Sequence, residues 1–507
     1  MRITPVGDLA VLVDVESLEE VHVLWRNLRS SPPAGTEEVI AGARSILATF
    51  QAGTNLAAAV ESIRTTTVSS ERVSVTPNRI EIPVVYDGPD IDDVAALSGI
   101  APSVVEARHS DPEYTVAFLG FSPGFAYLIG GDPSLRAPRL PSPRRSVPAG
   151  SVAVASEFTA VYPQSTPGGW RIVGRTDASM FDPSRPEPSL LAPGDLVRFK
   201  QVKEVGPFPP WRQDLGPPVS GDCFTVVDPG PLTTVQDVGR IGWGHLGVPR
   251  AGAADRRSAA FANSLVGNDP ASAVLEATLT GPLLRLGCDR LVAVTGARAT
   301  VTVDGIPARL DTALPLPAGS ELGVGNFRSG LRAYLAFAGG VDVGSVLGSR
   351  STDTLSWLGP PPLRAGDALP LGRPLGAASG AGDPAFRSFP CAGDLIRVRA
   401  VRGPRDGWIG PRGMETLYES VFEVDATSDR TGIRLKGPVV DVDRTEELPS
   451  EGVVAGAVQV PPGGSPIVLM RNHPTTGGYP VAAVVDEHGV DLLAQARPGV
   501  RVKFELA

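Results

Sequence analysis

The feature that most constrains the fold of this chain is a repeat within its glycine-rich sequence. The first copy runs GSVAVA from Gly150, QSTPGGWRIVG from Gln164 and LLAPGDLVRF from Leu190, and the second runs GAVQVP from Gly456, HPTTGGYPVAAV from His473 and LLAQARPGVRVKF from Leu492. A weaker echo, RAGDALPL, covers residues 364–371. Self-similarity at this range indicates one structural unit used more than once. We therefore expect a mainly β protein with two or three related barrels, each closing through a Pro-Gly or Gly-Asp turn into a final strand.

Length and charge limit the classes of protein to consider. A chain of 507 residues suggests roughly three or four domains of about 100–200 residues each. No apolar run approaches the ~20 residues of a membrane span, and the N-terminus is too acidic for a secretory signal, so we expect a cytoplasmic protein without a membrane partner. The formal charge of −9 argues against a nucleic-acid partner. The three scattered cysteines are expected to be reduced thiols.

The N-terminal residues differ from the rest in their helical signals. Ser17-Leu-Glu-Glu20 is a capping box that predicts a helix to about Leu28, and the surrounding pattern predicts a small α+β module of the ferredoxin-like type. The chain then becomes β-rich, apart from two short helices predicted to begin near Asp90 and at Pro102 and a helix predicted over 254–265. The predicted divisions are the α+β module at 1–77, a barrel at 78–203, a proline-rich linker at 204–221, a second barrel at 222–390 and a last barrel at 391–507.

Long motifs in register resemble a known family. YTVAFLGFSPGFAYL from Tyr114, the PSPRRSVPAGSVAVA segment and YPQSTPGGWRIVGRT resemble the B-type subunit of bacterial 5-oxoprolinase, formerly described as a sporulation-kinase inhibitor or allophanate hydrolase subunit 1. VVDPGPLTTVQDVGRIGWGHLGVPRAGAADRRSAAFANSLVGN from Val226, with SDRTGIRLKGP and TTGGYP, resembles the C-type subunit of 5-oxoprolinase, formerly allophanate hydrolase subunit 2. Both parts are also similar to the carboxyltransferase region of urea carboxylase. The resemblance covers nearly the whole chain.

This resemblance implies cyclophilin-like barrels and three alternative functions. The first is a fused component of an ATP-dependent 5-oxoprolinase, which hydrolyses a cyclic amide through a phosphorylated intermediate with ATP and Mg²⁺ and needs a separate A-type subunit. The second is a carboxyltransferase that acts with a biotin carrier, and the third is a regulatory module that binds a small molecule or a kinase. No lysine lies in a Met-Lys-Met context, so covalent biotin is not expected on this chain. Self-association stays open.

Several catalytic motifs are missing from the sequence. It contains no G-x-x-x-x-G-K-[ST] phosphate loop, no H-E-x-x-H zinc motif and no close cluster of histidines and cysteines. Phosphorylation of a lactam oxygen instead needs positioned cations and donors. We therefore looked for arginines, which bind anions through bidentate contacts, and for glycine loops with exposed backbone amides.

Glycine loops and arginines of the first barrel form one candidate substrate or nucleotide site. Glycine allows a backbone to approach a ligand closely, although the same glycines are equally suited to barrel turns. The predicted binding residues here are Phe121, Pro123, Gly124, Arg139, Arg144, Gly150, Ser151, Gly168, Gly169 and Arg175. His109 precedes the strand that leads to this motif, and it is either a general base, since its pKa lies near neutrality, or a structural residue at a helix end.

Two further candidate sites lie in the second half. Gln236, Asp237 and Arg240 bring an amide, a carboxylate and a cation within one turn, which suits orientation of an amide substrate; the alternative is a capped turn. The TGGY loop is equivalent by repeat to TPGGW, and with a nearby SDR motif it predicts binding residues Ser428, Asp429, Arg430, Gln459, Thr475, Gly477, Gly478 and Tyr479. No metal ligand set is predicted.

Overall fold

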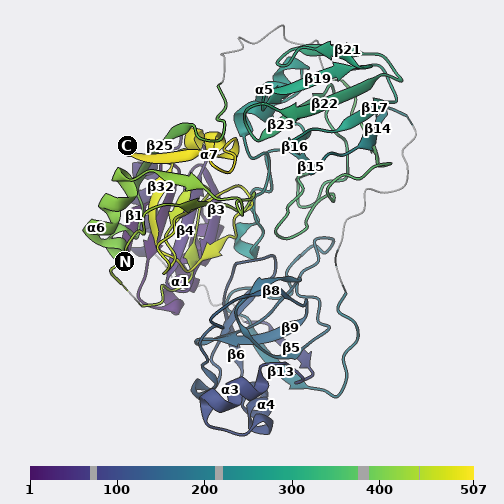
Figure 1. The fold of residues 1–507 in the computed structure, drawn as a ribbon. Coiled ribbons are helices and arrows are strands. Elements are labelled where there is room, and N and C mark those ends of the chain that lie inside the picture. The colour runs from purple at the N-terminus through teal and green to yellow at the C-terminus, as the bar shows by residue number, and fades with distance from the viewer. Residues whose placement is uncertain (69–76, 210, 212–220, 375–387, 445) are drawn as a thin grey trace.

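The computed structural model describes the whole chain except residues 69–76, 210, 212–220, 375–387 and 445, and shows an N-terminal module and three β-rich bodies (Figure 1). Most of the predicted linker at 204–221, and residues 69–76 near the end of the first predicted division, lie outside the described residues. Among the described residues, no helix is both long and apolar enough to cross a membrane. No disulfide joins Cys223, Cys288 or Cys391 within the described residues.

The N-terminal module is a four-stranded antiparallel sheet with two helices. Its elements are β1 (Arg2–Pro5), β2 (Ala10–Asp14), α1 (Leu18–Ser30), β3 (Thr36–Ala41), β4 (Ser45–Phe50) and α2 (Leu56–Val68), with strand order β1-β2-β4-β3. Ser17 accepts the Glu20 amide at 3.2 Å, so the predicted cap is confirmed. The ferredoxin-like detail is wrong: that motif runs βαββαβ, whereas here each helix follows an antiparallel hairpin.

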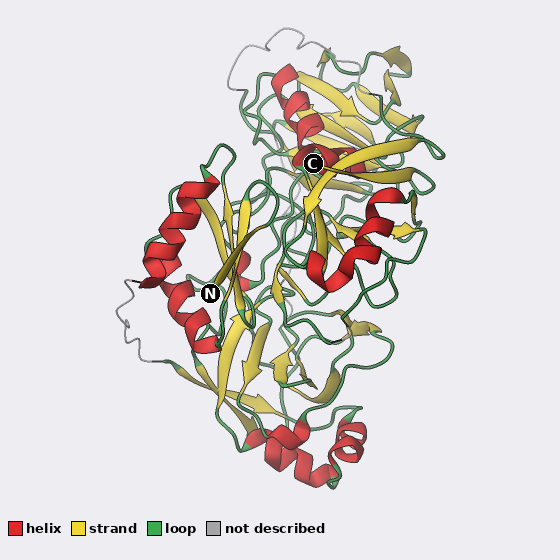
Figure 2. Cartoon of the chain, turned by 90° about the vertical axis from the view of Figure 1, so that its left-hand side faces the viewer, coloured by secondary structure: helices red, strands yellow, loops and turns green. Residues whose placement is uncertain are grey.

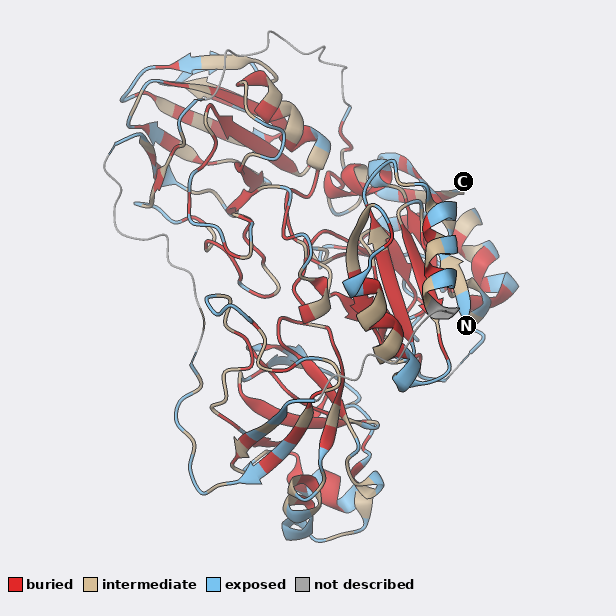
Figure 3. Ribbon diagram, turned by 180° about the vertical axis from the view of Figure 1, so that it is seen from behind, coloured by how far each residue is buried: buried red, intermediate tan, exposed pale blue. Residues whose placement is uncertain are grey.

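Both faces of this N-terminal sheet are buried (Figure 3). Successive side chains of a strand point to opposite faces. Along β2, Val11 and Val13 therefore pack with α1, α2 and the first barrel, whereas Ala10 and Leu12 pack against Val453 and other residues of the last barrel. The sheet thus joins the two barrels through apolar contacts on each side.

The first barrel follows the N-terminal module. Its elements are β5 (Arg79–Val84), α3 (Ile91–Ser98), α4 (Pro102–Ser110), β6 (Tyr114–Leu119), β7 (Ala126–Ile129), a 3₁₀ turn η1 (Pro133–Leu135), β8 (Arg144–Val147), β9 (Ser151–Ala155), β10 (Phe158–Val161), β11 (Thr166–Gly168), β12 (Arg171–Arg175) and β13 (Leu196–Gln201). The main sheet has the order β12-β9-β10-β7-β6-β13-β5. A bridge between Val85 and Arg175 links its two edges and closes the barrel.

The middle body consists of two sheets that share one hydrophobic core. Its elements are β14 (Cys223–Asp228), β15 (Thr233–Gln236), a 3₁₀ turn η2 (Gly244–Leu246), α5 (Arg256–Leu265), β16 (Val274–Thr278), β17 (Leu283–Leu286), β18 (Arg290–Gly296), β19 (Ala299–Val303), β20 (Ile306–Ala308), β21 (Ala313–Leu316), β22 (Glu321–Phe327), β23 (Arg332–Phe337) and β24 (Ala368–Pro370). The sequence predicted a barrel over residues 222–390, and the structure shows two sheets in this part of the chain. The echo at 364–371 supplies β24, which pairs antiparallel with β14 at a sheet edge.

The last body is a closed barrel of order β25-β32-β29-β30-β27-β26-β33. Its elements are β25 (Leu395–Arg402), α6 (Asp406–Glu419), β26 (Phe422–Val424), β27 (Gly432–Lys436), β28 (Glu451–Gly452), β29 (Ala457–Gln459), β30 (Ile467–Leu469), β31 (Thr476–Gly477), β32 (Val481–Val485), α7 (Glu487–Ala494) and β33 (Arg501–Leu506). Across the molecule the helices lie at the flanks and ends, outside the sheets (Figure 2).

The repeat corresponds to one structural unit in the first and last barrels. In both, the strand after the glycine loop pairs antiparallel with the strand from the GSVAVA or GAVQVP segment, as β12 with β9 and β32 with β29. The final strand runs parallel to the first, as β13 with β5 and β33 with β25. The two glycine loops also lie in equivalent two-stranded ribbons, β11 with β8 and β31 with β28. These shared pairings confirm the mainly β, cyclophilin-like fold class.

Candidate functional site

The glycine loops of the two halves meet in the structure. Phe121 adopts a left-handed backbone conformation with φ 64°, and its amide donates to Thr476 Oγ1 at 3.0 Å. A Cβ on Gly120 would lie 2.1 Å from the same oxygen. The Gly124 amide donates to the Leu246 carbonyl at 2.9 Å. The loop that contains Phe121, Pro123 and Gly124 is therefore a contact between the halves.

Beside this contact lies a cavity of about 1090 Å³, which we call the glycine-loop cavity. Arg139 lines it from the first barrel, and Gly478 and Tyr479 line it from the last. Arg139 Nε lies 3.4 Å from Glu447 Oε1, and the Tyr479 side chain is exposed. The Gln459 side-chain amide donates to the Tyr479 carbonyl at 3.3 Å. The structure thus brings predicted residues from both halves to one cavity.

The other predicted residues of the first barrel hold turns and ion pairs. Arg144 donates to Asp90 at 2.7 Å, and Arg175 donates to Asp87 at 2.8 Å. Added Cβ atoms on Gly150 and Gly168 would lie 2.4 Å from a backbone carbonyl and a tyrosine hydroxyl, respectively, while Gly169 has more space around it and Ser151 begins β9. The ion pairs with Asp90 and Asp87 favour structural roles for Arg144 and Arg175, although Arg144 Nη1 is buried without a hydrogen-bond partner among the described residues.

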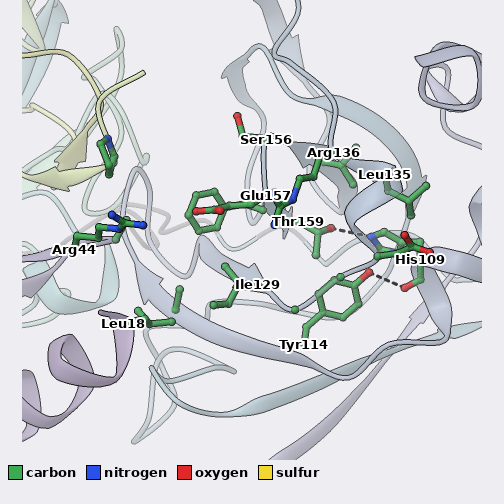
Figure 4. A pocket seen from close by; sticks show the side chains of 18 of the residues that line it. Leu18, Arg44, His109, Tyr114, Ile129, Leu135, Arg136, Ser156, Glu157 and Thr159 are labelled. Atoms are coloured by element: carbon green, nitrogen blue, oxygen red, sulfur yellow. Dashed lines mark hydrogen bonds between the residues drawn. The ribbon is translucent and has the colours of Figure 1, made fainter. Parts of the chain in front are cut away.

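His109 lies at one end of a different pocket, of about 590 Å³, between α4, β10 and the N-terminal module (Figure 4). Thr159 donates its hydroxyl proton to the Ala153 carbonyl at 3.0 Å, so it accepts from His109 Nε2–H at 2.8 Å. His109 Nδ1 then accepts from Tyr86 at 2.8 Å. Burial lowers the pKa of His109 to about 3. A neutral ring with both nitrogens bonded favours a structural role over that of a base.

Asp237 is surrounded by hydrogen-bond donors from its own domain. Its carboxylate accepts from the Gly239 amide at 2.8 Å, the Ser349 hydroxyl at 2.6 Å, the Arg350 amide at 2.6 Å and the Ser351 hydroxyl at 2.5 Å. It therefore fixes the loop at 349–351. This pattern is that of the capped turn considered from the sequence.

Gln236 and Arg240 are also enclosed, and both are fully buried. Gln236 donates to Thr234 and to the Thr352 carbonyl, each at 3.0 Å. Arg240 donates to the Ser351 carbonyl at 2.5 Å. Burial lowers the pKa of Arg240, and the nearby Asp353 and Asp237 oppose that effect. None of the described cavities is lined by these two side chains.

The three residues of the SDR motif differ in burial: Arg430 is buried, whereas Ser428 and Asp429 lie nearer the surface. Arg430 is buried and pairs with Glu276, and it also donates to the Asn472 side chain at 3.0 Å. Although burial acts to raise it, the pKa of Glu276 is lowered because Arg430 and Arg332 stabilise its charge. Asp429 accepts two amides of its own turn, from Thr431 at 2.7 Å and from Gly432 at 3.1 Å. Ser428 accepts the Arg434 amide at 3.0 Å. Arg430 thus joins the middle body to the last barrel.

Gly477 and Thr475 complete the predicted residues of the last barrel. A Cβ on Gly477 would lie 2.7 Å from Gln459 Nε2, so this glycine allows the ribbon to pass close to β29. The Thr475 hydroxyl is buried without a hydrogen-bond partner among the described residues, and Thr475 lines a large cavity on the other side of the loop. Thr475 thus connects the predicted loop with a site that the sequence did not indicate.

This site is a cavity of about 810 Å³, which we call the junction cavity. It lies between the N-terminal sheet, the segment 244–256 and the last barrel. Arg250, Arg256 and Arg471 line it together with Glu38. Glu38 accepts the Gly242 and Gly244 amides at 2.5 and 2.9 Å, and burial raises its pKa to about 7. No local pattern could have indicated this set, because its members lie on segments far apart in the sequence.

Among the described residues, no group of three or more histidine, cysteine, aspartate or glutamate side chains is arranged to hold a metal ion. Arginines and backbone amides are instead the groups that the cavities offer to an anion. A magnesium ion is commonly bound by one or two carboxylates together with substrate phosphates. Two carboxylates of this type, Asp441 and Asp443, line the glycine-loop cavity.

Comparisons with known proteins agree with the division into two halves. The family model "Carboxyltransferase domain, subdomain C and D" matches residues 1–191, and "Carboxyltransferase domain, subdomain A and B" matches residues 246–506. The B-type 5-oxoprolinase subunit of Escherichia coli O157:H7 is 42% identical over 207 residues, which are 39% of this chain and 95% of that protein. The C-type 5-oxoprolinase subunit of Escherichia coli K12 is 35% identical over 285 residues, which are 55% of this chain and 89% of that protein.

A urea amidolyase and a solved structure extend these similarities. The urea amidolyase of Lachancea kluyveri is 31% identical over 308 residues, which are 56% of this chain but 17% of that protein. The crystal structure of TTHA0988 has a TM-score of 0.87 and 34% sequence identity, and the match covers 98% of this chain and 99% of that one. Both halves of the chain therefore have solved or curated counterparts.

Proposed function

This chain belongs to the carboxyltransferase-domain family, with the subdomain C and D half placed before the A and B half, and from that premise we propose that it is the fused B and C component of an ATP-dependent 5-oxoprolinase. It would act with a separate A-type subunit on a cyclic amide. The two relatives named as 5-oxoprolinase subunits match consecutive parts of this chain over most of their own lengths, which supports a fused pair. The site residues below are part of the same proposal.

The observation that carries the proposal is that both halves contribute to the glycine-loop cavity. Arg139 comes from the half similar to the B-type subunit, and Trp408 and Tyr479 come from the half similar to the C-type subunit. A site between two subunits is complete only when they associate. A covalent connection keeps them at an effective concentration of about millimolar for a short flexible linker. This arrangement explains why one chain would carry both parts.

The cavity offers the groups that phosphorylation of a lactam needs. The lactam carbonyl is a poor electrophile, so transfer of the terminal phosphoryl group of ATP to its oxygen releases ADP and creates a leaving group. Water then adds to the activated carbon and the ring C–N bond breaks, which gives a free amine and an acyl phosphate. A second water hydrolyses the acyl phosphate to the carboxylate and free phosphate. Arg139 and Arg412 would bind the phosphate oxygens and stabilise the charge that develops on them.

Aromatic and acidic side chains of the same cavity would hold the nucleotide and its metal. Tyr479 and Trp408 line the cavity, and the Arg444 guanidinium lies 5.1 Å from the Trp408 ring centre. Aromatic faces stack on bases. Asp441 and Asp443 are carboxylates of the type that binds Mg²⁺ with phosphates.

The test is a turnover assay with the full chain, an A-type subunit, 5-oxoproline, ATP and Mg²⁺. We expect ADP and ring-opened product to form in equal amounts, and only with both proteins present. Arg139→Ala should reduce the rate about a hundredfold, whereas the control Arg175→Ala removes an arginine that binds Asp87 outside the cavity and should leave the rate near that of the unmodified protein. Equal rates for the two variants would exclude this cavity, and absence of ATP-dependent ring opening would refute the function.

The second candidate function is that of a carboxyltransferase. The description of the matching family models and the similarity to urea amidolyase favour it. The two functions differ in their co-substrate. Transfer of a carboxyl group from a carboxylated biotin carrier, without ADP formation by an A-type subunit, would replace the 5-oxoprolinase proposal with this one.

A further inference from the structure

Among the three arginines of the junction cavity that lie beside carboxylates, Arg256 has the longest ion-pair distance. Arg250 Nη1 lies 2.7 Å from Glu37, and Arg471 binds Glu487 through both terminal nitrogens, at 3.1 and 2.6 Å. The Nη1 atom of Arg256 is farther from its carboxylate partner, at 3.8 Å from Oε1 of the same Glu487. Its Nε is buried and has no hydrogen-bond partner in the described part of the chain.

The surroundings make this weakly paired arginine costly for the free protein. Arg256 begins α5 and its side chain lines the junction cavity. Burial, followed by repulsion from Arg471 and Arg250, lowers its pKa to about 9. A buried charge is tolerated when an opposite charge and hydrogen bonds compensate it. An anionic ligand in the cavity would supply that compensation.

We propose that the junction cavity binds the carboxylate of a small organic acid, with Arg256 as the cation that receives it. Arginine presents a planar fork of donors that matches a carboxylate. The site goes beyond the proposed function because it is a second cavity, separate from the glycine-loop cavity, and its evidence does not depend on the reaction.

The remaining charges select a ligand with a single negative charge. Glu37 and Glu487 pair closely with Arg250 and Arg471, which leaves Arg256 as the least compensated of these three arginines. Asp8 and Asp486 also line the cavity and repel a multiply charged phosphate more strongly than a monocarboxylate, whereas Glu38, whose pKa burial raises to about 7, is partly protonated near neutral pH. Arg399, which lines the cavity too, is exposed, and solvent screens its charge. His473 also lines the cavity. Burial lowers its pKa to about 4, so it is neutral near pH 7 and contributes no positive charge to the cavity.

The rest of the wall favours an acid with a compact apolar body. Val6, Ile40, Phe50 and Val484 line the cavity, and they come from both the N-terminal sheet and the last barrel. Binding pockets of small molecules usually combine such apolar walls with a few polar groups that fix orientation. A small ring that carries one carboxylate fits this combination.

The experiment measures binding to the full chain by isothermal titration calorimetry, without ATP or any partner. The probes are L-5-oxoproline, its uncharged amide, cyclopentanecarboxylate and inorganic phosphate; only the choice of 5-oxoproline rests on the proposed function. We expect a monocarboxylate to bind and the uncharged amide and phosphate to bind much more weakly. Arg256→Gln should weaken carboxylate binding about tenfold to a hundredfold, as for loss of a charged hydrogen bond.

A neighbouring arginine provides the control, and thermal unfolding provides a second measurement. Arg257 is the next residue of α5, is exposed and does not itself line the cavity, although its Nη1 lies 2.8 Å from Nδ1 of the cavity-lining His488. Because Arg257 does not reach the cavity, Arg257→Gln should bind the carboxylate much more tightly than Arg256→Gln. Unliganded Arg256→Gln should unfold at the same or a higher temperature, because it removes repulsion. A large drop in its unfolding temperature with unchanged binding would show that Arg256 is structural.

Other results would separate this inference from the proposed function. Binding of cyclopentanecarboxylate but not of 5-oxoproline would support the carboxylate site and count against 5-oxoproline as the ligand. Failure of both carboxylates to bind, equal binding of phosphate, or equal affinity in Arg256→Gln would overturn the inference. The turnover assay of Arg139→Ala is independent of each of these outcomes.

Discussion

Replacement of Asp237 distinguishes a structural carboxylate from a catalytic one. The sequence makes Asp237 a catalytic candidate, whereas the structure places four donors around its two oxygens. Asp237→Ala would leave the Ser351 hydroxyl and the Arg350 amide without their acceptor. We therefore expect a stability effect larger than any effect on ligand binding.

The magnitude follows from the number and type of these bonds. A hydrogen bond to a charged group contributes about 1.5–3 kcal/mol, but four bonds to one half-buried carboxylate are not additive because water replaces part of them. Loss of one partner from a buried charged network costs about 3–5 kcal/mol, which we take as the expected value. For a domain of about 170 residues, each kcal/mol corresponds to about 2–4 °C, so the unfolding temperature should fall by about 6–20 °C.

Two further variants set the scale. Asp237→Asn keeps an acceptor for the bonds to Oδ1 and loses mainly the Arg350 amide at Oδ2, so it should cost about 1–3 kcal/mol. Asp342→Ala removes a carboxylate that is 54% exposed and binds the same Arg350, so it should cost less than about 1 kcal/mol.

The assay is calorimetric unfolding of the three variants, combined with the turnover measurement described above. The expected order of destabilisation is Asp237→Ala, then Asp237→Asn, then Asp342→Ala. An unchanged unfolding temperature for Asp237→Ala together with an abolished turnover would refute the structural account and restore Asp237 as a catalytic candidate.

Three further predictions concern the contact between the halves. Residues 1–206 and 221–507, expressed as separate chains, should co-purify because the N-terminal sheet packs against the last barrel; separate elution at micromolar concentration would contradict this. Gly120→Ala should weaken that association, since its Cβ would lie 2.1 Å from Thr476 Oγ1, whereas Gly407→Ala, which meets no atom within 4 Å, should not. Burial raises the pKa of Glu38 from 4.5 to about 7, so the folded state binds this proton more tightly than the unfolded state does. The resulting stabilisation of the folded state is complete below about pH 4.5 and is lost as the pH rises through about 7. Glu38→Gln should flatten the unfolding temperature over that pH range, and an unchanged slope would argue against the raised pKa.

Much of the local structure could be predicted because its causes are local. Ser17 caps α1 through a residue three positions away, and Asp255 caps α5 by accepting the Ser258 amide at 3.0 Å. The repeat indicated the shared barrel pairings, since the same turns and strands recur in the same order. The connectivity of the N-terminal module and the two-sheet arrangement of the middle body were not predicted from these signals, because pairing between distant segments decides both.

The predicted site residues show the same limit. Arg139, Gly478 and Tyr479 share a cavity, which the equivalence of the two glycine loops could suggest but not locate. In the sequence, Arg430 and Arg139 are both arginines near glycine-rich motifs. In the structure, Arg430 is buried against Glu276, a residue 154 positions earlier in the sequence. Sequence spacing identifies a cation but does not reveal which carboxylate it will meet.

The sequence by itself determined the mainly β class, the two related barrels, the caps and turns, and the motifs that place the chain in its family. These features depend on neighbouring residues or on similarity between segments. Only the tertiary structure decided which groups are paired and which face a cavity. Because the N-terminal sheet is buried between the two barrels, it brings Glu38 beside Arg250, more than two hundred residues later in the chain, and Arg256 remains weakly paired beside Arg471. The physical reason is that burial, distance and counter-charge are properties of packed surfaces, and those surfaces exist only after the domains have docked.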